Sequence, residues 1–446
     1  MDNLAYEGAW FSQAYSTCPT CIAARRCILT GQHARSHGMQ GYAERVLWDN
    51  PVTLPQALRD AGYHTYFVGR DMHQYPSRKR FGYDHMVTTD DYITWLEAQL
   101  PYETGHAGGG IYRDNTMYAY GVMHNDYTAH PWELPEHLHF TNYTMMQAKK
   151  FMELRDPTQP FFLTISFLAP HPPLIPPRFY YDRYIRREPP DIPIGDWAVR
   201  PVNDGIGLRA DGSDINKHPV DTSVVMEGEL GREAMAAYYA SINHIDDQIR
   251  RLVYGINGID FNDTAVIYTS DHGELLGDHY LWRKSLPYNG SARIPFIVRL
   301  PNRVKTRRGV RHDMPVCLED IMPTALDIAD VQIPDTVDGR SLLPVMTDGA
   351  PPDRAHLHLL HSPKFHAIAD GRFKYIWFAD TGREQLFDIE HDKNEMRDLI
   401  HDPSSAFFAD ELRQTLINEL RDAPEGFVSN GELIAGRPFG PLRGKV

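Results

Sequence analysis

The stretch TAVIYTSDHGELLGDHYLWRK, residues 264–284, predicts both a fold class and the place of a functional site. Residues 264–269 form a near-continuous apolar run, which is typical of a strand buried on both faces of a parallel sheet. The run ends at Ser270-Asp271-His272-Gly273, so polar side chains stand at the carboxyl end of that strand. Open α/β sheets place their ligands at this edge.

Strand-like and helix-like segments alternate along most of the chain, which predicts an α/β fold with a sheet covered by helices on both faces. Beyond about residue 350 the pattern changes to short β-rich runs followed by a helix over residues 410–421. We therefore expect a main domain over residues 1–350 and a smaller C-terminal α+β subdomain over residues 351–446, with a four-stranded antiparallel sheet and a helix. Further expected elements are a helix over 54–61, strands over 63–68 and 161–168, and a long helix over 233–253.

The composition excludes several classes of protein. Acidic residues number 59 against 45 basic ones, a net charge of −14, whereas a general nucleic-acid binder needs a clustered basic surface. No segment approaches the ~18–20 apolar residues of a membrane span. The chain begins without a basic and apolar leader, which predicts a cytoplasmic protein; a signal ahead of Met1 would instead make it periplasmic or secreted. Only four cysteines occur, too few for a disulfide framework.

The segment CIAARRCILTG, residues 21–31, offers a candidate nucleophile. Cys21 stands four residues before Arg25 at the start of a helical stretch, and a cation and a helix N-terminus both favour a thiolate. The alternatives are a small buried residue, or Cys18-x-x-Cys21 as a redox pair or half of a metal knuckle, although a second CxxC is absent. Cys317 lies in an apolar stretch that we interpret as helical core.

Asp271 and His272 offer an oxygen and a nitrogen ligand to a divalent ion, and the neighbouring glycines allow close backbone approach. Lys284 could then supply a point charge to a tetrahedral oxyanion held at that ion. The alternative for Asp-His-Gly alone is a simple turn.

Both segments resemble the type I sulfatases, the formylglycine-dependent branch of the alkaline phosphatase-like superfamily. Cys21-x-Ala23-x-Arg25 followed by Leu-Thr-Gly is similar to the sulfatase signature Cys-x-Pro-x-Arg, and residues 271–284 are similar to that family's second metal and sulfate segment. The resemblance implies an alkaline phosphatase-like mixed sheet sandwiched by helices. It extends in the same order to residues 65–69 with His73, to 169–173, to 320–324, and to 374–375 with 386–388.

The resemblance also implies roles for the residues around Cys21. Cys21 would be oxidised to formylglycine, whose hydrate attacks sulfur through one hydroxyl while the other later expels sulfate. Arg25 would hold that diol, and His73 would lie against its hydroxyl. His171 and Lys284 would grip the sulfate and the leaving oxygen.

A divalent ion would be bound by Asp271, His272 and the residue-21 oxygen. Calcium is the expected ion, with manganese as the alternative because His272 supplies nitrogen. Arg70 and His279 are second-rank candidates for substrate binding, with a turn cap as the alternative for His279. We interpret Asp246-Asp247 as the polar face of a helix and Asp90-Asp91 as solvated loop residues.

Three features depart from the family pattern. Ala23 replaces the signature proline, a form associated with the anaerobic radical-type maturase and a bacterial source. Gly69-Arg70-Asp71-Met72-His73 has one residue more than the family's Gly-Lys-x-His and has Arg for Lys. The family's opening strand, which ends in two consecutive aspartates, would precede the segment at residues 3–8, so we expect that strand to be missing here. The chain then either starts at an internal methionine or has an incomplete site.

These features predict a sulfuric ester hydrolase acting on an aryl or carbohydrate sulfate. The alternatives are a phosphonate monoester or phosphodiester hydrolase of the same superfamily, and a catalytically impaired relative that binds sulfate esters. Specificity is expected from residues 102–125, from the proline-rich segment after His171 and from the C-terminal tail.

Overall fold

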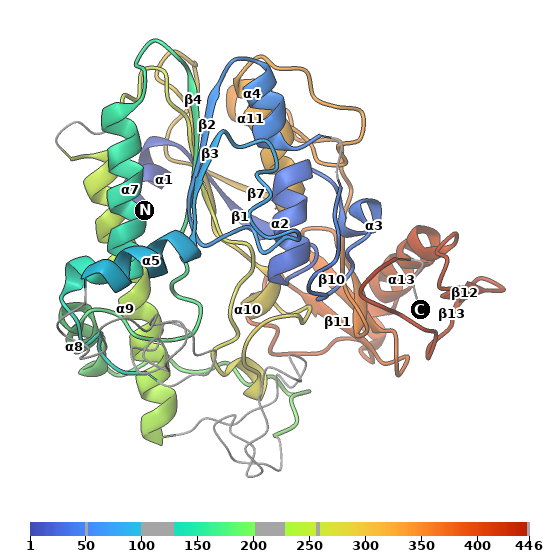
Figure 1. Cartoon of the computed structure of the whole chain (residues 1–446). Coiled ribbons are helices and arrows are strands. Elements are labelled where there is room, and N and C mark those ends of the chain that lie inside the picture. Colours follow the sequence, from blue (N-terminus) through green and yellow to red (C-terminus); the bar gives the residue numbers. More distant parts are fainter. Residues whose placement is uncertain (50–51, 100–128, 201–227, 256–258, 444–446) are drawn as a thin grey trace.

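The computed structural model describes residues 1–49, 52–99, 129–200, 228–255 and 259–443. Helices lie on both sides of the central strands: α5, α7 and α9 on one side, and α2, α4 and α11 on the other (Figure 1). The helices are α1 (Asp2–Glu7), α2 (Cys21–Thr30), α3 (Ala34–His37), α4 (Leu54–Asp60), α5 (Thr89–Gln99), α7 (Phe140–Leu154), α8 (Arg178–Ile185), α9 (Gly228–Val253), α10 (Asn289–Ala292), α11 (Ile321–Ile328), α12 (Leu343–Thr347) and α13 (Ala406–Leu420).

The strands form a mixed central sheet, a parallel sheet and an antiparallel C-terminal sheet, with orders β5-β6-β1-β7, β3-β2-β4 and β11-β10-β9-β8. In the mixed sheet β1 runs antiparallel to β6 and parallel to β7. The strands are β1 (Ala9–Tyr15), β2 (His64–Gly69), β3 (His85–Val87), β4 (Phe161–Ser166), β5 (Val266–Thr269), β6 (Phe296–Arg299), β7 (Val310–Cys317), β8 (Leu357–His361), β9 (Phe365–Ala369), β10 (Phe373–Phe378), β11 (Glu384–Asp388), β12 (Val428–Ser429) and β13 (Glu432–Leu433). The expected α/β mixed sheet is therefore confirmed.

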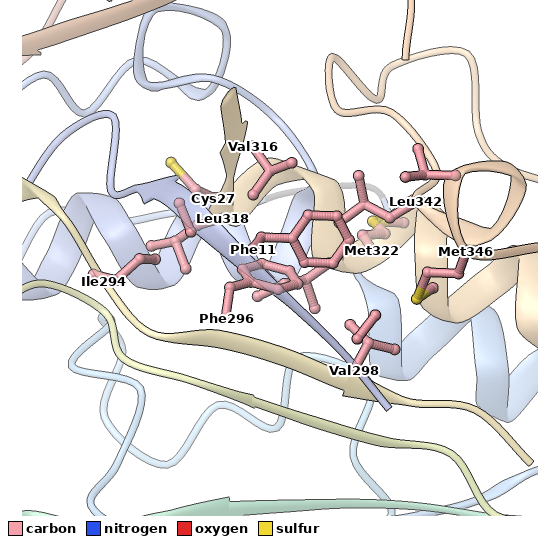
Figure 2. Close-up of a cluster of buried hydrophobic side chains, with 14 of the residues drawn as sticks. Phe11, Cys27, Ile294, Phe296, Val298, Val316, Leu318, Met322, Leu342 and Met346 are labelled. Carbon is pink, nitrogen blue, oxygen red and sulfur yellow. The ribbon is translucent and has the colours of Figure 1, made fainter. Parts of the chain in front are cut away.

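The main core lies between the mixed sheet and the helices α2 and α11. Phe11 of β1 packs edge-to-face against Phe296 of β6, with ring centroids 5.7 Å apart. Figure 2 shows the surrounding side chains from β7, α2 and α11 closing over this pair. This packing fixes α2, and with it the site at the N-terminus of α2, against the sheet.

The C-terminal part forms the expected four-stranded antiparallel sheet with α13 packed on it. One further core cluster joins this sheet to the mixed sheet, because Tyr15 and Tyr288 pack with Leu359 and Phe387. The domain boundary at residue 350 stays a prediction.

The two strands predicted to be buried are half-buried instead. Every residue of β4 and of β5 has intermediate exposure. The reason is that, among the described residues, β4 pairs only with β2 and β5 only with β6. The apolar runs predicted both strands correctly. How deeply a strand is buried, however, depends on which strands pair with its two edges, and the sequence of the strand alone does not contain that information.

Two smaller expectations were wrong. Cys317 is buried in the core as expected, but it is the last residue of β7 rather than part of a helix, and its strand pairs with β1 at Tyr15. The apolar run there spans a strand end and the following helical turn. Asp90 and Asp91 lie in the first turn of α5, where carboxylates favourably face the helix N-terminus, and Asp91 accepts a hydrogen bond from Arg78 at 2.9 Å.

The two aspartates of the long helix α9 are partly exposed and pair with polar groups, as expected. Asp247 accepts a hydrogen bond from the Tyr180 hydroxyl at 3.1 Å, and Asp246 pairs with the amino group of Met1. Across the described residues, we find no helix with both the length and the apolar character that crossing a membrane requires.

Candidate active site

Cys21 is the first residue of α2 and is 3% exposed. Thr20 precedes it in an extended conformation, and α2 ends at Gly31, whose φ of 62° terminates the helix in the left-handed region. The free N–H groups and the macrodipole of α2 favour negative charge at Cys21. The helix thus places residue 21 where an anionic centre is stabilised.

Cys21, Asp271 and His272 come together although they are far apart in sequence. The Cys21 Sγ lies 3.3 Å from His272 Nε2, and His272 Nε2 lies 3.7 Å from Asp271 Oδ1. One donor atom from each residue lies within 4.8 Å of the others. The Asp271-His272 turn after β5 therefore brings two possible metal ligands next to Cys21.

The orientation of His272 suits it to bind a metal. Its Nδ1 lies 2.8 Å from the Gly273 carbonyl oxygen, so Nδ1–H donates there and Nε2 faces Cys21. Burial opposes the charge of His272, but Asp271 and Cys21 raise the pKa of the ring, and an ion bound at Nε2 would replace the proton there. With one Asp271 oxygen and one residue-21 atom, the donor set is an oxygen, a nitrogen and the group at position 21. This set fits one face of a divalent ion.

Arg25 connects the nucleophile helix to the acidic side of the site. Its Nε donates to Asp271 Oδ2 at 3.0 Å and its Nη1 donates to the Asp71 carbonyl at 2.5 Å. Burial opposes the charge of Arg25, but Asp271 and Cys21 outweigh this and raise its pKa. Arg25 therefore stays a cation one helical turn from residue 21.

Lys284 and His171 form the opposite side of the site. Lys284 Nζ lies 3.2 Å from His171 Nε2, and His171 Nδ1–H donates to the Pro172 carbonyl at 2.7 Å. The Nε2 lone pair therefore accepts from the ammonium group. Burial, Lys284 and Arg70 lower the pKa of His171 to about 3, so the imidazole is neutral at pH 7.

The electrostatics at Cys21 favour an anion. Burial raises the pKa of the thiol, but Lys284, His272 and Arg70 more than compensate and hold it well below its usual value. Cys18 differs from Cys21, because burial and the nearby Glu319 raise the pKa of its thiol well above the usual value. Of the two cysteines in the CxxC segment, only Cys21 sits in an environment that suits a reactive group.

The remaining predicted residues lie at different distances from this centre. Arg70, directly after β2, contributes positive charge at Cys21. The His73 ring packs against Tyr42 and lies 3.7 Å from Glu44, on the outer side of the site. His279 accepts a hydrogen bond from the Gly195 N–H at 3.0 Å and packs on Trp197, which supports the turn alternative; its substrate role stays a prediction.

Two contributors were missed by the sequence reasoning. The main-chain carbonyl of Asp71 accepts a hydrogen bond from Arg25. Every residue has such a carbonyl, so the sequence could not identify this contact. Tyr42 packs against His73, and Cys21 is among the groups that raise the pKa of its hydroxyl, after burial and Glu44. The specificity segment at residues 102–125 lies outside the described residues.

Comparison with known proteins decides the family. The sulfatase family model matches residues 1–331, and the model described as N-sulphoglucosamine sulphohydrolase, C-terminal, matches residues 277–422. The chain is 36% identical over 462 residues to an arylsulfatase of Clostridium perfringens, covering 99% of this chain and 93% of that protein.

The chain belongs to the sulfatase family. This assignment makes it an enzyme of the sulfuric ester hydrolase class. It is also 26% identical to a choline-sulfatase of Rhizobium meliloti, covering 94% of this chain and 80% of that protein.

Solved structures share the fold of this sulfatase. A protein crystallised with D-glucosamine-2-N,6-O-disulfate aligns with a TM-score of 0.68 at 23% identity, over 94% of this chain and 92% of the other. A phosphonate monoester hydrolase of Agrobacterium radiobacter aligns with a TM-score of 0.72 at 20% identity, over 98% and 94%. These similarities confirm the alkaline phosphatase-like architecture.

Proposed function

We propose that this sulfatase hydrolyses an aryl or carbohydrate sulfate ester at residue 21, after Cys21 has been converted to formylglycine. The observation that carries the proposal is the convergence of Cys21 with Asp271 and His272 on one side and Lys284 and His171 on the other. In this conversion the C–S bond breaks and the sulfur leaves as sulfide, water supplies the aldehyde oxygen, and two electrons pass to an acceptor that the maturase provides. We assign that step to a dedicated maturase, of the anaerobic type that Ala23 suggests.

The cations of the site fit a sulfate ester. Lys284 Nζ and the Arg70 guanidinium supply positive charge at residue 21, where the sulfate oxygens would lie. A sulfate monoester is a monoanion, so each contact that strengthens as charge develops on its oxygens lowers the barrier to attack.

His171 and Lys284 are placed to manage the leaving group. Because His171 Nε2 accepts one hydrogen bond from Lys284, the other two ammonium hydrogens stay available to the substrate. Lys284 can donate to the departing oxygen, and neutral His171 can hold Lys284 in that orientation. Arg25 holds the group at position 21 from the first turn of α2, and His73 would act on it from the outer side.

Asp271, His272 and the oxygen at position 21 would hold the divalent ion. When bound, the ion favours the ionised form of a nearby hydroxyl and neutralises charge on the sulfate. Calcium takes about 6–8 oxygen ligands, more than these residues offer, so water and substrate would complete its shell. Manganese is the alternative because His272 supplies nitrogen.

A comparison of substrates tests the proposed reaction against its nearest alternative. The protein, co-expressed with a formylglycine-generating maturase, is assayed for kcat/KM on an aryl sulfate and on the matching aryl phosphonate monoester. We expect the sulfate to be preferred by at least about 10-fold, which corresponds to about 1.4 kcal/mol of transition-state discrimination. An equal or greater rate on the phosphonate would replace the proposal with a phosphonate or phosphodiester hydrolase. Binding of sulfate esters without turnover would indicate a catalytically impaired relative.

A further inference from the structure

A buried ion pair joins the C-terminal sheet to the loop that carries Lys284. Lys374, on β10, is 0% exposed and Glu395, after β11, is 1% exposed; Lys374 Nζ lies 2.5 Å from Glu395 Oε1. Taking both charges out of water costs several kcal/mol per ion, and apolar residues of the same volume are often at least as stable. A reason other than stability is therefore needed for this pair.

The remaining hydrogen bonds of the pair point at one short segment. Lys374 Nζ donates to the Pro287 carbonyl at 2.7 Å and to Asn289 Oδ1 at 2.9 Å. The Asn289 N–H donates to Glu395 Oε2 at 2.6 Å. The pair thus binds the main chain of Pro287 and both the main chain and the side chain of Asn289.

This segment touches both halves of the active site. Residues 289–292 form α10, and the Ser291 carbonyl accepts from the N–H of Gly273, the residue after His272, at 2.7 Å. The contact is close, because a Cβ on Gly273 would lie 2.2 Å from the Gly290 carbonyl oxygen. Any shift of α10 is therefore transmitted to the Asp271-His272 turn.

On its other side the segment leads directly to Lys284. Arg283 and Ser285 flank that lysine with φ angles of 67° and 71°, in the left-handed region that is unfavourable for non-glycine residues. Such a conformation persists only when its surroundings hold it. The Ser285 N–H donates to the Pro19 carbonyl at 3.0 Å, close to Cys21, which ties the loop to the nucleophile segment.

Trp197, which follows the proline-rich segment, contacts both Glu395 and the loop before α10. Trp197 Nε1–H donates to the Glu395 carbonyl at 2.7 Å, and the Trp197 ring stacks on Tyr288 with centroids 4.5 Å apart. Lys374 therefore contacts the loop before α10, and Glu395 contacts both α10 and Trp197.

From these contacts we infer that the Lys374–Glu395 pair positions the active site: through residues 287–289 it sets the placement of Lys284 and of the Asp271-His272 turn. Neither residue touches the reacting atoms, so both are positioning residues. The inference deepens the proposed function and rests on it for the roles of Lys284 and His272. The pair fixes the position of the loop and does not itself contact the substrate. Its loss should therefore lower kcat, which reports the chemical step, more than it changes KM.

The test replaces both charges at once, with Lys374→Met and Glu395→Met in the full chain. The double change avoids leaving one buried charge alone, so we expect the variant to fold, as thermal unfolding would show. We expect kcat for the sulfate ester to fall at least about 10-fold with KM changed less than about 3-fold, since small misplacements of reacting groups cost up to about 100-fold in rate. Hydrogen–deuterium exchange of residues 284–291 should become at least about 10-fold faster.

The matched control is the double variant Arg413→Met and Glu384→Met. This second pair joins α13 to the C-terminal sheet, with Arg413 Nε 3.0 Å from Glu384 Oε1, and none of its described hydrogen bonds or ion pairs involves residues 287–289. Its loss should leave kcat and the exchange of residues 284–291 unchanged.

Asn289→Ala keeps the inference testable should the double methionine variant not fold. It removes one of the two acceptors of Lys374 in residues 287–289 while leaving the ion pair in place, and it should lower kcat and speed the exchange in the same direction. Unchanged kcat, a change in KM alone, or unchanged exchange in a folded variant would overturn the inference. If the unaltered protein hydrolyses no sulfate ester, the proposed function fails, and the exchange measurement alone then decides the inference.

Discussion

Replacing Cys21 with alanine is expected to lower kcat for a sulfate ester by at least about 10³-fold, because the variant loses the group that we propose as the precursor of the nucleophile. The substitution removes a single sulfur atom at the buried start of α2, so the fold should survive. The measurement is kcat on an aryl sulfate, with the thermal midpoint as a check of folding.

Cys18→Ala is the matched control for that experiment. Cys18 is also buried and stands three residues away. Its thiol differs from that of Cys21 because burial and Glu319 raise its pKa. Activity should stay within a few-fold of the unaltered protein. A loss of activity in Cys18→Ala equal to that in Cys21→Ala would instead favour the redox-pair interpretation of the CxxC segment.

Replacing Asp271 with asparagine is expected to abolish binding of the divalent ion and to lower kcat by about 10²–10³-fold. The change preserves shape, but it removes the charge that both the ion and Arg25 require; Arg25 Nε lies 3.0 Å from Asp271 Oδ2. Metal content after dialysis against calcium or manganese, together with kcat, measures the effect.

Asp246→Asn with Asp247→Asn controls for a general loss of acidic charge. These adjacent carboxylates lie on α9 and bind Met1 and Tyr180 rather than the site. Metal content and kcat should be unchanged. Full metal occupancy in Asp271→Asn would contradict the assignment of Asp271 as a ligand.

Much of the fold could be predicted because its signals are local. The apolar run before Ser270, the helical spacing of α9 and the short β-rich runs after residue 350 each lie within one segment. The half-burial of β4 and β5 could not be predicted, because it depends on which strands pair with their edges.

The candidate site divides in the same way. Cys21, Arg25, Asp271, His272 and Lys284 were found from residue type and spacing, and their side chains converge. The Asp71 carbonyl and the Lys374–Glu395 pair were not found as parts of the site. A main-chain acceptor has no sequence signature, and a buried ion pair is recognised only when the tertiary contacts of both residues are known.

The mass of the tryptic peptide ending at Arg25, from protein purified from its native host, tests the central claim most directly. Our account predicts a peptide in which residue 21 has lost its thiol sulfur and gained an aldehyde oxygen, and which reacts with a hydrazide probe. A peptide that carries an unmodified Cys21 thiol throughout the purified protein would contradict it.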